Sequence, residues 1–182
     1  MKRTIVTPAV LPPTALAELK QWLGITTAQD DAPLRALLAA GAAMCEAFTG
    51  IMPLEQTAEE ALRPCTAWQR LATRPVHAII GIEAVAASGA RSPLAITEYA
   101  VELEADGTAS VRLLRSSSAP RIAVRFIAGL AADWDSLPEP LRHGIIRLAA
   151  HQHRERETSG SAPQPPAAVV ALWQPWRRMR LL

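Results

Sequence analysis

The chain has 182 residues, which is long enough for one domain with a real hydrophobic core. Its 19 Lys and Arg residues against 17 Asp and Glu residues leave a net charge of only +2. A protein that wraps nucleic acid through its whole surface normally carries a larger basic excess, so the charge argues weakly against a dedicated DNA-binding protein. No run of about 18 apolar residues occurs, so we expect a soluble chain without a membrane partner.

A first, short helix is expected near the N-terminus. Thr14 follows two prolines and is the expected N-cap, and leucines then recur at helical spacing until Gly24. This pattern predicts a helix at about residues 15–23.

A longer helix is expected at about residues 32–49, with Asp30 or Asp31 as its N-cap. The middle of this helix contains only Ala and Gly, so another backbone can approach it closely. That backbone could belong to the same subunit or to a second one, and the sequence leaves both possibilities open. The candidate subunit-interface residues are Ala39, Ala40, Gly41 and Ala43.

Helical spacing gives way to alternation and turn residues at about residues 51–133, which predicts a β-rich insertion. The dipeptide Asp106-Gly107 is a strong hairpin signal, because both central positions of a type I′ turn need positive φ. The expected strands lie around residues 76–82, 99–103, 111–113 and 122–126.

A third helix is expected at about residues 138–157, where Ser136 and Glu139 have the spacing of a capping box. Residues 158–166 are rich in Pro, Ser and Gly and form the expected linker. A short helix and a C-terminal tail follow at residues 167–182.

The expected fold class is therefore α+β. About four helices form the core, a β-rich insertion separates the second helix from the third, and an extended tail ends the chain. Residues 1–157 are expected to form a single domain.

The C-terminal tail combines large apolar side chains with arginines after a proline-rich linker. Such side chains are hard to bury in their own domain, and aromatic residues with Arg are typical anchors of protein interfaces. A tail folded back on its own core and a basic tail that touches DNA phosphates are the alternatives. The candidate docking residues are Trp173, Trp176, Arg177, Arg178, Met179, Arg180, Leu181 and Leu182.

His151 and His153 are the most tempting metal ligands in the sequence. Residues two apart on a helix point about 200° away from each other, so these two side chains cannot converge on one ion. The i, i+4 pairs that they form with Glu155 and Glu157 are more simply solvated contacts on the helix surface.

No catalytic motif is recognisable either. Cys45 lies on the apolar stripe of the second helix, where a small core residue is the expected role. The glycines fall at predicted helix ends and turns and not in phosphate-binding or nucleophile motifs. We therefore expect no enzyme, no catalytic residue, no cofactor and no metal site.

Several short segments together resemble one protein family. They are LAELKQWL (residues 16–23), CEAFTG (45–50), YAVE (99–102), FIAG (126–129), PEPLRHGIIRL (138–148) and PWRRMRL (175–181). In this order they are similar to the head-to-tail connector proteins, also called adaptor or head-completion proteins, of long-tailed bacteriophages and phage-like gene transfer agents. The resemblance covers nearly the whole chain.

The resemblance implies a structural protein in the neck of a virion or phage-like particle, made in the bacterial cytoplasm. About twelve copies would form a ring beneath the portal protein and continue its channel, with DNA only as passing cargo. The ring would offer a platform to a stopper or tail-terminator protein. Residues 176–182 match the family's C-terminal segment, which is expected to reach the portal.

Two other classes remain as alternatives. The first is a small DNA-binding or regulatory module that uses the Arg-rich tail, and the second is an enzyme with an unrecognised site. Rings in electron micrographs would favour a connector, whereas steeply salt-dependent DNA affinity would favour the DNA-binding module.

Overall fold

A computed structural model describes residues 2–155 and 165–177 of the chain. The chain divides into two compact units. The β unit draws on residues 1–9 and 55–130, and the helical unit draws on residues 10–54 and 131–182. The predicted α+β fold class is confirmed, since helices and antiparallel sheets both occur.

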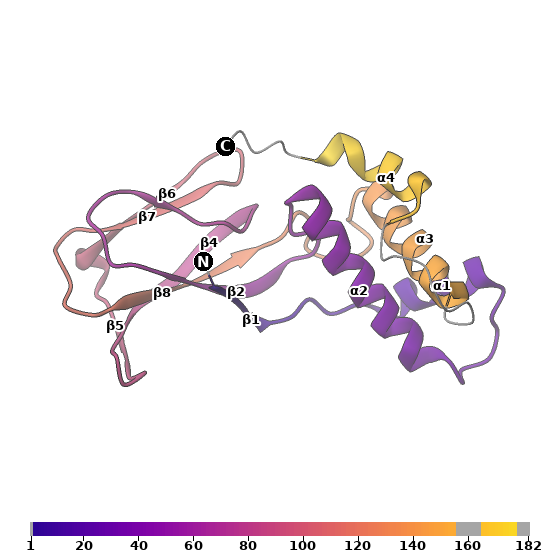
Figure 1. The fold of residues 1–182 in the computed structure, drawn as a ribbon, viewed down its shortest axis with the longest axis horizontal. Coiled ribbons are helices and arrows are strands. Elements are labelled where there is room, and N and C mark those ends of the chain that lie inside the picture. Colours follow the sequence, from indigo (N-terminus) through magenta and orange to yellow (C-terminus); the bar gives the residue numbers. More distant parts are fainter. Residues whose placement is uncertain (1, 156–164, 178–182) are drawn as a thin grey trace. The chain divides into compact units, whose positions relative to one another are not determined.

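The helical unit consists of four α-helices in the described part of the chain (Figure 1). They are α1 (Pro13–Leu23), α2 (Asp31–Thr49), α3 (Glu139–Glu155) and α4 (Ala167–Trp173), and the 3-10 helix η2 (Gln174–Trp176) follows α4. The contact of α2 with α3 is the most extensive, α1 packs against both, and α4 lies mainly on α3. Leucines at helical spacing, Leu34 and Leu38 among them, are completely buried and hold this unit together.

The C-terminal ends of α1 and α2 lie where the sequence predicted them, whereas the N-terminal end of α1 differs from the prediction. Helices α1 and α2 end at Gly24 and Gly50, whose φ angles of 74° and 73° lie in the left-handed region that favours glycine. Helix α1 begins at Pro13, with Pro12 in the N-cap position, so the prediction of Thr14 as the cap was wrong. Proline suits the first helical position because its missing N–H has no helical partner there.

The caps of α2 and α3 also differ in detail. Asp30 is the N-cap residue of α2, but its side chain makes no capping hydrogen bond. Before α3, the Ser136 hydroxyl accepts a hydrogen bond from the Asp133 N–H at 3.3 Å, and the Asp133 carboxylate accepts one from the Ser136 N–H at 2.8 Å. Since α3 begins only at Glu139, the predicted capping box of Ser136 and Glu139 was wrong.

The β unit contains two antiparallel sheets. The larger sheet has the order β1 (Lys2–Thr7), β2 (Gln56–Leu62), β8 (Arg121–Ala128), β4 (Val76–Val85) and β5 (Arg91–Pro93). The smaller sheet has the order β3 (Gln69–Arg70), β7 (Ala109–Leu113) and β6 (Tyr99–Leu103), with the 3-10 helix η1 (Ile96–Glu98) just before β6. All four predicted strands are present. The sequence had given no sign of β1, which lies outside the predicted β-rich segment.

The hairpin predicted at Asp106-Gly107 joins β6 to β7, but its turn is of another type. Gly107 has a φ of 79°, whereas no non-glycine residue of the described chain has a positive φ. Asp106 therefore lacks the conformation that a type I′ turn needs, and the prediction of that turn type was wrong. A hydrogen bond of 2.9 Å from the Gly107 N–H to the Glu104 carbonyl closes the turn instead.

A buried carboxylate ties β2 to the segment before β4. Glu60 is completely buried. Its carboxylate accepts hydrogen bonds from the backbone N–H of Ala72 at 2.9 Å, from the backbone N–H of Thr73 at 2.8 Å and from the Thr73 hydroxyl at 2.6 Å. Three donors offset much of the cost of removing this carboxylate from water, so Glu60 has a structural role inside the β unit.

Candidate subunit and docking interfaces

The small-residue region of α2 has two faces with different roles. Gly41 is buried against α3, where an added Cβ would lie 3.1 Å from the Ile145 Cγ2 and 3.2 Å from the Ile145 carbonyl oxygen. Gly41 therefore serves packing within the chain, which is one of the two possibilities that the sequence left open. It is not available as a subunit-interface residue, because α3 already occupies the space beside it.

The other candidates on α2 face outward. Ala39, Ala40 and Ala43 are exposed, on the side of the helix opposite Gly41. With the exposed Ala36 and Ala47 they form one stripe, which we call the alanine ridge. This ridge is a smooth surface of methyl groups, which another helix can approach closely.

Trp173 belongs to the core of the helical unit and not to an exposed tail. It is completely buried, and its indole N–H donates a 3.4 Å hydrogen bond to the Leu141 carbonyl. The indole lies on Gly144, where an added Cβ would come within 2.7 Å of the Trp173 Cε2. Phe48 of α2 packs beside it, with ring centroids 6.0 Å apart. The assignment of Trp173 to a docking surface is therefore corrected, because α4 folds back on α3 and buries this side chain.

The rest of the candidate tail begins where this packing ends. Trp176 is half-buried, Arg177 is exposed, and the Arg177 guanidinium lies 5.5 Å from the ring centroid of Phe48. The remaining predicted docking residues, at positions 178–182, lie outside the described residues.

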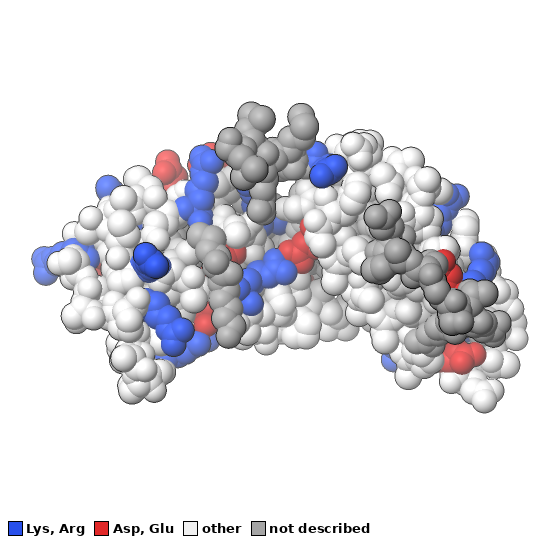
Figure 2. Space-filling view, viewed as in Figure 1, with Lys and Arg blue, Asp and Glu red and all other residues white. Residues whose placement is uncertain are grey.

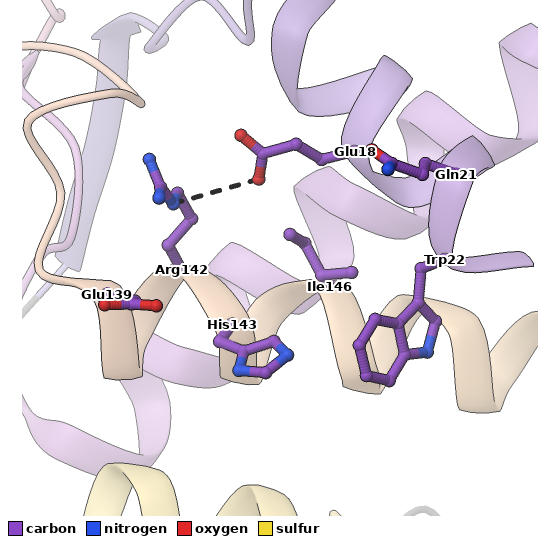
Figure 3. A pocket seen from close by; sticks show the side chains of 7 residues that line it. All are labelled: Glu18, Gln21, Trp22, Glu139, Arg142, His143 and Ile146. Atoms are coloured by element: carbon purple, nitrogen blue, oxygen red, sulfur yellow. Dashed lines mark ion pairs between the residues drawn. The ribbon is translucent and has the colours of Figure 1, made fainter.

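A groove between α1 and α3 was not anticipated from the sequence. Its volume is about 330 Å³ (Figure 3). It is lined by Glu18, Gln21, Trp22, Glu139, Arg142, His143 and Ile146. We call it the Trp22 groove.

Trp22 forms one wall of this groove and is 43% exposed. The His143 ring meets its indole edge to face, with ring centroids 5.2 Å apart and the planes at 82°. The Arg147 guanidinium lies 5.4 Å from the indole centroid, and Glu18 pairs with Arg142 at 3.8 Å. Trp22 was not singled out from the sequence; a tryptophan off the leucine stripe of α1 is the one signal in the sequence that could have indicated this site.

The β unit carries many charged side chains that neutralise one another. The two terminal guanidinium nitrogens of Arg91 donate hydrogen bonds to the Glu59 carboxylate, at 2.7 and 2.8 Å, and Glu83 and Arg125 extend this network across four neighbouring strands. The hydrogen bond from Arg91 is the main reason why the pKa of Glu59 is lowered. Arg70 and Arg74 also have acidic partners, in Glu104 and Asp106 respectively.

Most of the basic side chains in view gather over the β unit in Figure 2, with acidic and uncharged ones between them. Since four arginines of the β unit pair with carboxylates, this unit offers less net positive charge to a phosphate backbone than its number of arginines suggests.

Two predictions for ionisable side chains, the pair of His151 with Glu155 and the burial of Cys45, are confirmed. His151 contacts Glu155 at 3.1 Å, as an i, i+4 pair on α3, whereas Glu157 lies outside the described residues. Cys45 is buried, and this burial raises the pKa of its thiol to about 12, so it is a protonated core residue at neutral pH. Over the described ranges, no group of three His, Cys, Asp or Glu residues could hold a metal ion, and no helix could cross a membrane.

No protein-family model matches the sequence, and no curated protein matches it. Solved structures do match over the whole chain. A chain in the neck of an empty gene transfer agent particle, with C6 symmetry, is 27% identical with a TM-score of 0.76. A chain in the neck of a native particle, with C12 symmetry, is 28% identical with a TM-score of 0.75, and one in the native virion is 28% identical with a TM-score of 0.73.

Each match covers 100% of this chain and 98% of the other. The likeness therefore extends over both units of the chain. Full-length similarity of this kind, in fold and in more than a quarter of the residues, confirms the resemblance that the ordered sequence segments indicated. Over its whole length the chain is thus similar to proteins from gene transfer agent particles, two of them from the particle neck, and this similarity supports a head-to-tail connector-type protein.

Proposed function

We propose that this protein forms an oligomeric ring beneath the portal, where it continues the DNA channel and provides the platform for a stopper or tail protein. One observation carries the proposal, namely the full-length similarity to chains from particle necks with sixfold and twelvefold symmetry. Cyclic symmetry requires that each subunit contacts two neighbours through surfaces of its own. The two exposed features of the helical unit, the alanine ridge and the Trp22 groove, supply such surfaces.

The alanine ridge of α2 is proposed as one side of the contact between subunits. Ala39, Ala40 and Ala43 stay exposed after the helical unit has packed, although methyl groups gain stability from burial. A helix surface without long side chains loses little rotamer entropy when a neighbour covers it. Gly41 is no part of this surface, because it faces α3.

The C-terminal segment from Trp176 is proposed as the contact with the portal. Trp173, seated on Gly144, fixes the point at which this segment leaves the helical unit. The sequence beyond it offers Met179, Leu181 and Leu182 as apolar anchors and three arginines as partners for carboxylates or carbonyls. DNA is proposed as passing cargo, because a channel that bound phosphates tightly would slow its passage.

Electron microscopy of the purified protein, alone and mixed with its portal protein, tests this function. We expect closed rings with one central channel, coaxial with the portal ring. A protein that stays monomeric at every concentration, and that neither binds the portal nor forms rings on it, would contradict the proposal. Steeply salt-dependent binding to duplex DNA by such a monomer would favour the DNA-binding module instead.

A further inference from the structure

We propose that the Trp22 groove receives the alanine ridge of the neighbouring subunit. This inference rests on the proposed ring and names the two surfaces that meet in it. The ridge belongs to α2 alone, whereas the groove is built by α1 and α3. The contact would therefore be head-to-tail, with a different surface contributed by each of the two subunits.

A ring of identical subunits requires such a pair of surfaces. In a closed ring of more than two subunits, each subunit meets its neighbours through two different and complementary patches. A self-complementary patch would instead end the assembly at the dimer. The two patches must also lie on different sides of the subunit, so that both neighbours can bind at once.

The helical unit has this arrangement. The buried residues of α2, such as Leu38 and Gly41, face the other helices, so the alanine ridge faces away from α1 and α3. The Trp22 groove lies between α1 and α3 and is open, and no residue of α2 lines it. Ridge and groove thus belong to different surfaces of the helical unit and share no residue.

The geometry of the groove allows a helix with small side chains to enter it. The groove of about 330 Å³ is concave, with Ile146 buried in it and Trp22 beside it (Figure 3). A helix that carries only methyl groups can sink into such a groove, because small side chains permit a short distance between helix axes. A helix with long side chains on this face would be held away from it.

Trp22 has the properties of an interface anchor. It is 43% exposed, and its ring is held in place by His143 at its edge and by Arg147 over its face. A tryptophan whose orientation is fixed before binding loses little entropy when a partner covers it, and tryptophan and arginine are both enriched at interface hot spots.

Charges at the border of the two surfaces are compatible with this pairing. Arg35 is exposed on α2 and is the only basic residue of this helix. Glu139, at the groove, is exposed as well. Such border charges contribute more to the orientation and rate of association than to its affinity.

Two variants test the proposal, because mixing them should restore one subunit contact. A general loss of stability would not give this result. Ala40→Arg blocks the ridge and leaves the groove intact, whereas Trp22→Ala damages the groove and leaves the ridge intact. Each variant alone should fail to form rings, with the subunit contact weakened roughly thirtyfold or more. Mixed in equal amounts, they should form a dimer and nothing larger, because the intact ridge of one fits the intact groove of the other. Native mass spectrometry distinguishes these species.

Matched controls keep the test specific. Trp68→Ala removes a tryptophan of the β unit that is 44% exposed, and Ala171→Arg enlarges an exposed alanine of α4. Both should still form rings. Circular dichroism should show that all four variants remain folded.

Where rings form only on the portal, disulfide cross-linking on that complex gives the same information. A chain with Ala40→Cys, Gln21→Cys and Cys65→Ser should yield a ladder of covalent oligomers, and each single cysteine should yield none. If wild-type rings form while Trp22→Ala assembles normally and the cross-linked ladder is absent, the inference is wrong and the proposed function stands. If the wild-type protein forms no ring even on the portal, the proposed function itself is wrong.

Discussion

Gly144 lies in the middle of α3 beneath the indole of Trp173. An alanine there would place its Cβ 2.7 Å from the Trp173 Cε2 and 2.9 Å from the Cδ1. Neither distance is tolerated in a packed core, and the indole cannot tilt without losing its hydrogen bond to the Leu141 carbonyl. The absence of one side chain on α3 thus determines where α4 can lie.

We expect Gly144→Ala to lower the free energy of unfolding by about 1–3 kcal/mol, the usual cost of overpacking a core. Thermal unfolding followed by circular dichroism measures it. Gly81→Ala is the matched control, because a Cβ at Gly81 would meet no atom within 4 Å. Equal stability of the two variants would show that Trp173 does not pack on Gly144.

The lowered pKa of Glu59 leads to a prediction of how the stability of the fold depends on pH. Its pKa is lowered in the folded protein, first because of the hydrogen bond from Arg91 and then because of the charges of Arg91 and Arg125. A carboxyl whose pKa is lower in the folded state stabilises the fold above its unfolded pKa, which is about 4.3 for Glu. That contribution is lost as the pH falls through the lower, folded value.

We therefore expect Arg91→Gln to be less stable than the wild type at pH 7, with a difference that shrinks as the pH falls below about 4. Urea unfolding at several pH values measures this difference. Arg115→Gln removes an exposed arginine that has no carboxylate partner among the described residues, and it serves as the control. A difference that stays constant from pH 7 to pH 3 would contradict the role of the Glu59 pair.

At the scale of elements, α4 and the segment after it have different roles, which the sequence could not distinguish. Helix α4 stabilises the fold, and the segment after it is the proposed docking segment. Helix α4 is part of the helical core through Val169 and Trp173, which are both buried. The segment from Arg177 onward begins exposed. Stability and docking should therefore respond differently to truncation on either side of η2.

Deletion of residues 177–182 should leave the midpoint of thermal unfolding nearly unchanged and abolish binding to the portal. The reason is that the deletion removes the proposed anchors but keeps Trp173 on Gly144. Surface plasmon resonance with immobilised portal measures the binding, and deletion from Ala167 onward serves as the contrasting variant, since it should also destabilise the fold. Normal portal binding by the shorter deletion would show that the docking role of this segment is wrong.

At the scale of the whole molecule, the balance of basic and acidic residues predicts a low affinity for duplex DNA. The chain has 19 basic against 17 acidic residues, and several arginines of the β unit pair with carboxylates. We expect no submicromolar binding of duplex DNA in gel-shift assays at physiological salt. A basic DNA-binding protein in the same assay provides the positive control. Tight binding that weakens steeply with added salt would mean that DNA is a ligand of the ring and more than its cargo.

Several features of this protein could be predicted from local sequence alone. The spacing of leucines placed α1 and α2, the glycines at 24 and 50 ended them, and alternation placed β4, β6, β7 and β8. These predictions succeeded because helix and strand periods depend on neighbouring residues only. The order of short sequence segments also indicated a connector-type protein, without any information on tertiary contacts.

Other features were decided only by tertiary structure. The sequence indicated that the helix face with Gly41 suits a close contact and that Trp173 needs an apolar partner, but not that α3 is the partner of both. Strand β1 acquires its conformation by pairing with β2, fifty or more residues away, and the Trp22 groove exists only because α1 and α3 lie together. Local spacing tells which face of an element is apolar. Which neighbour covers that face depends on contacts between distant segments, and these arise only when the chain has folded.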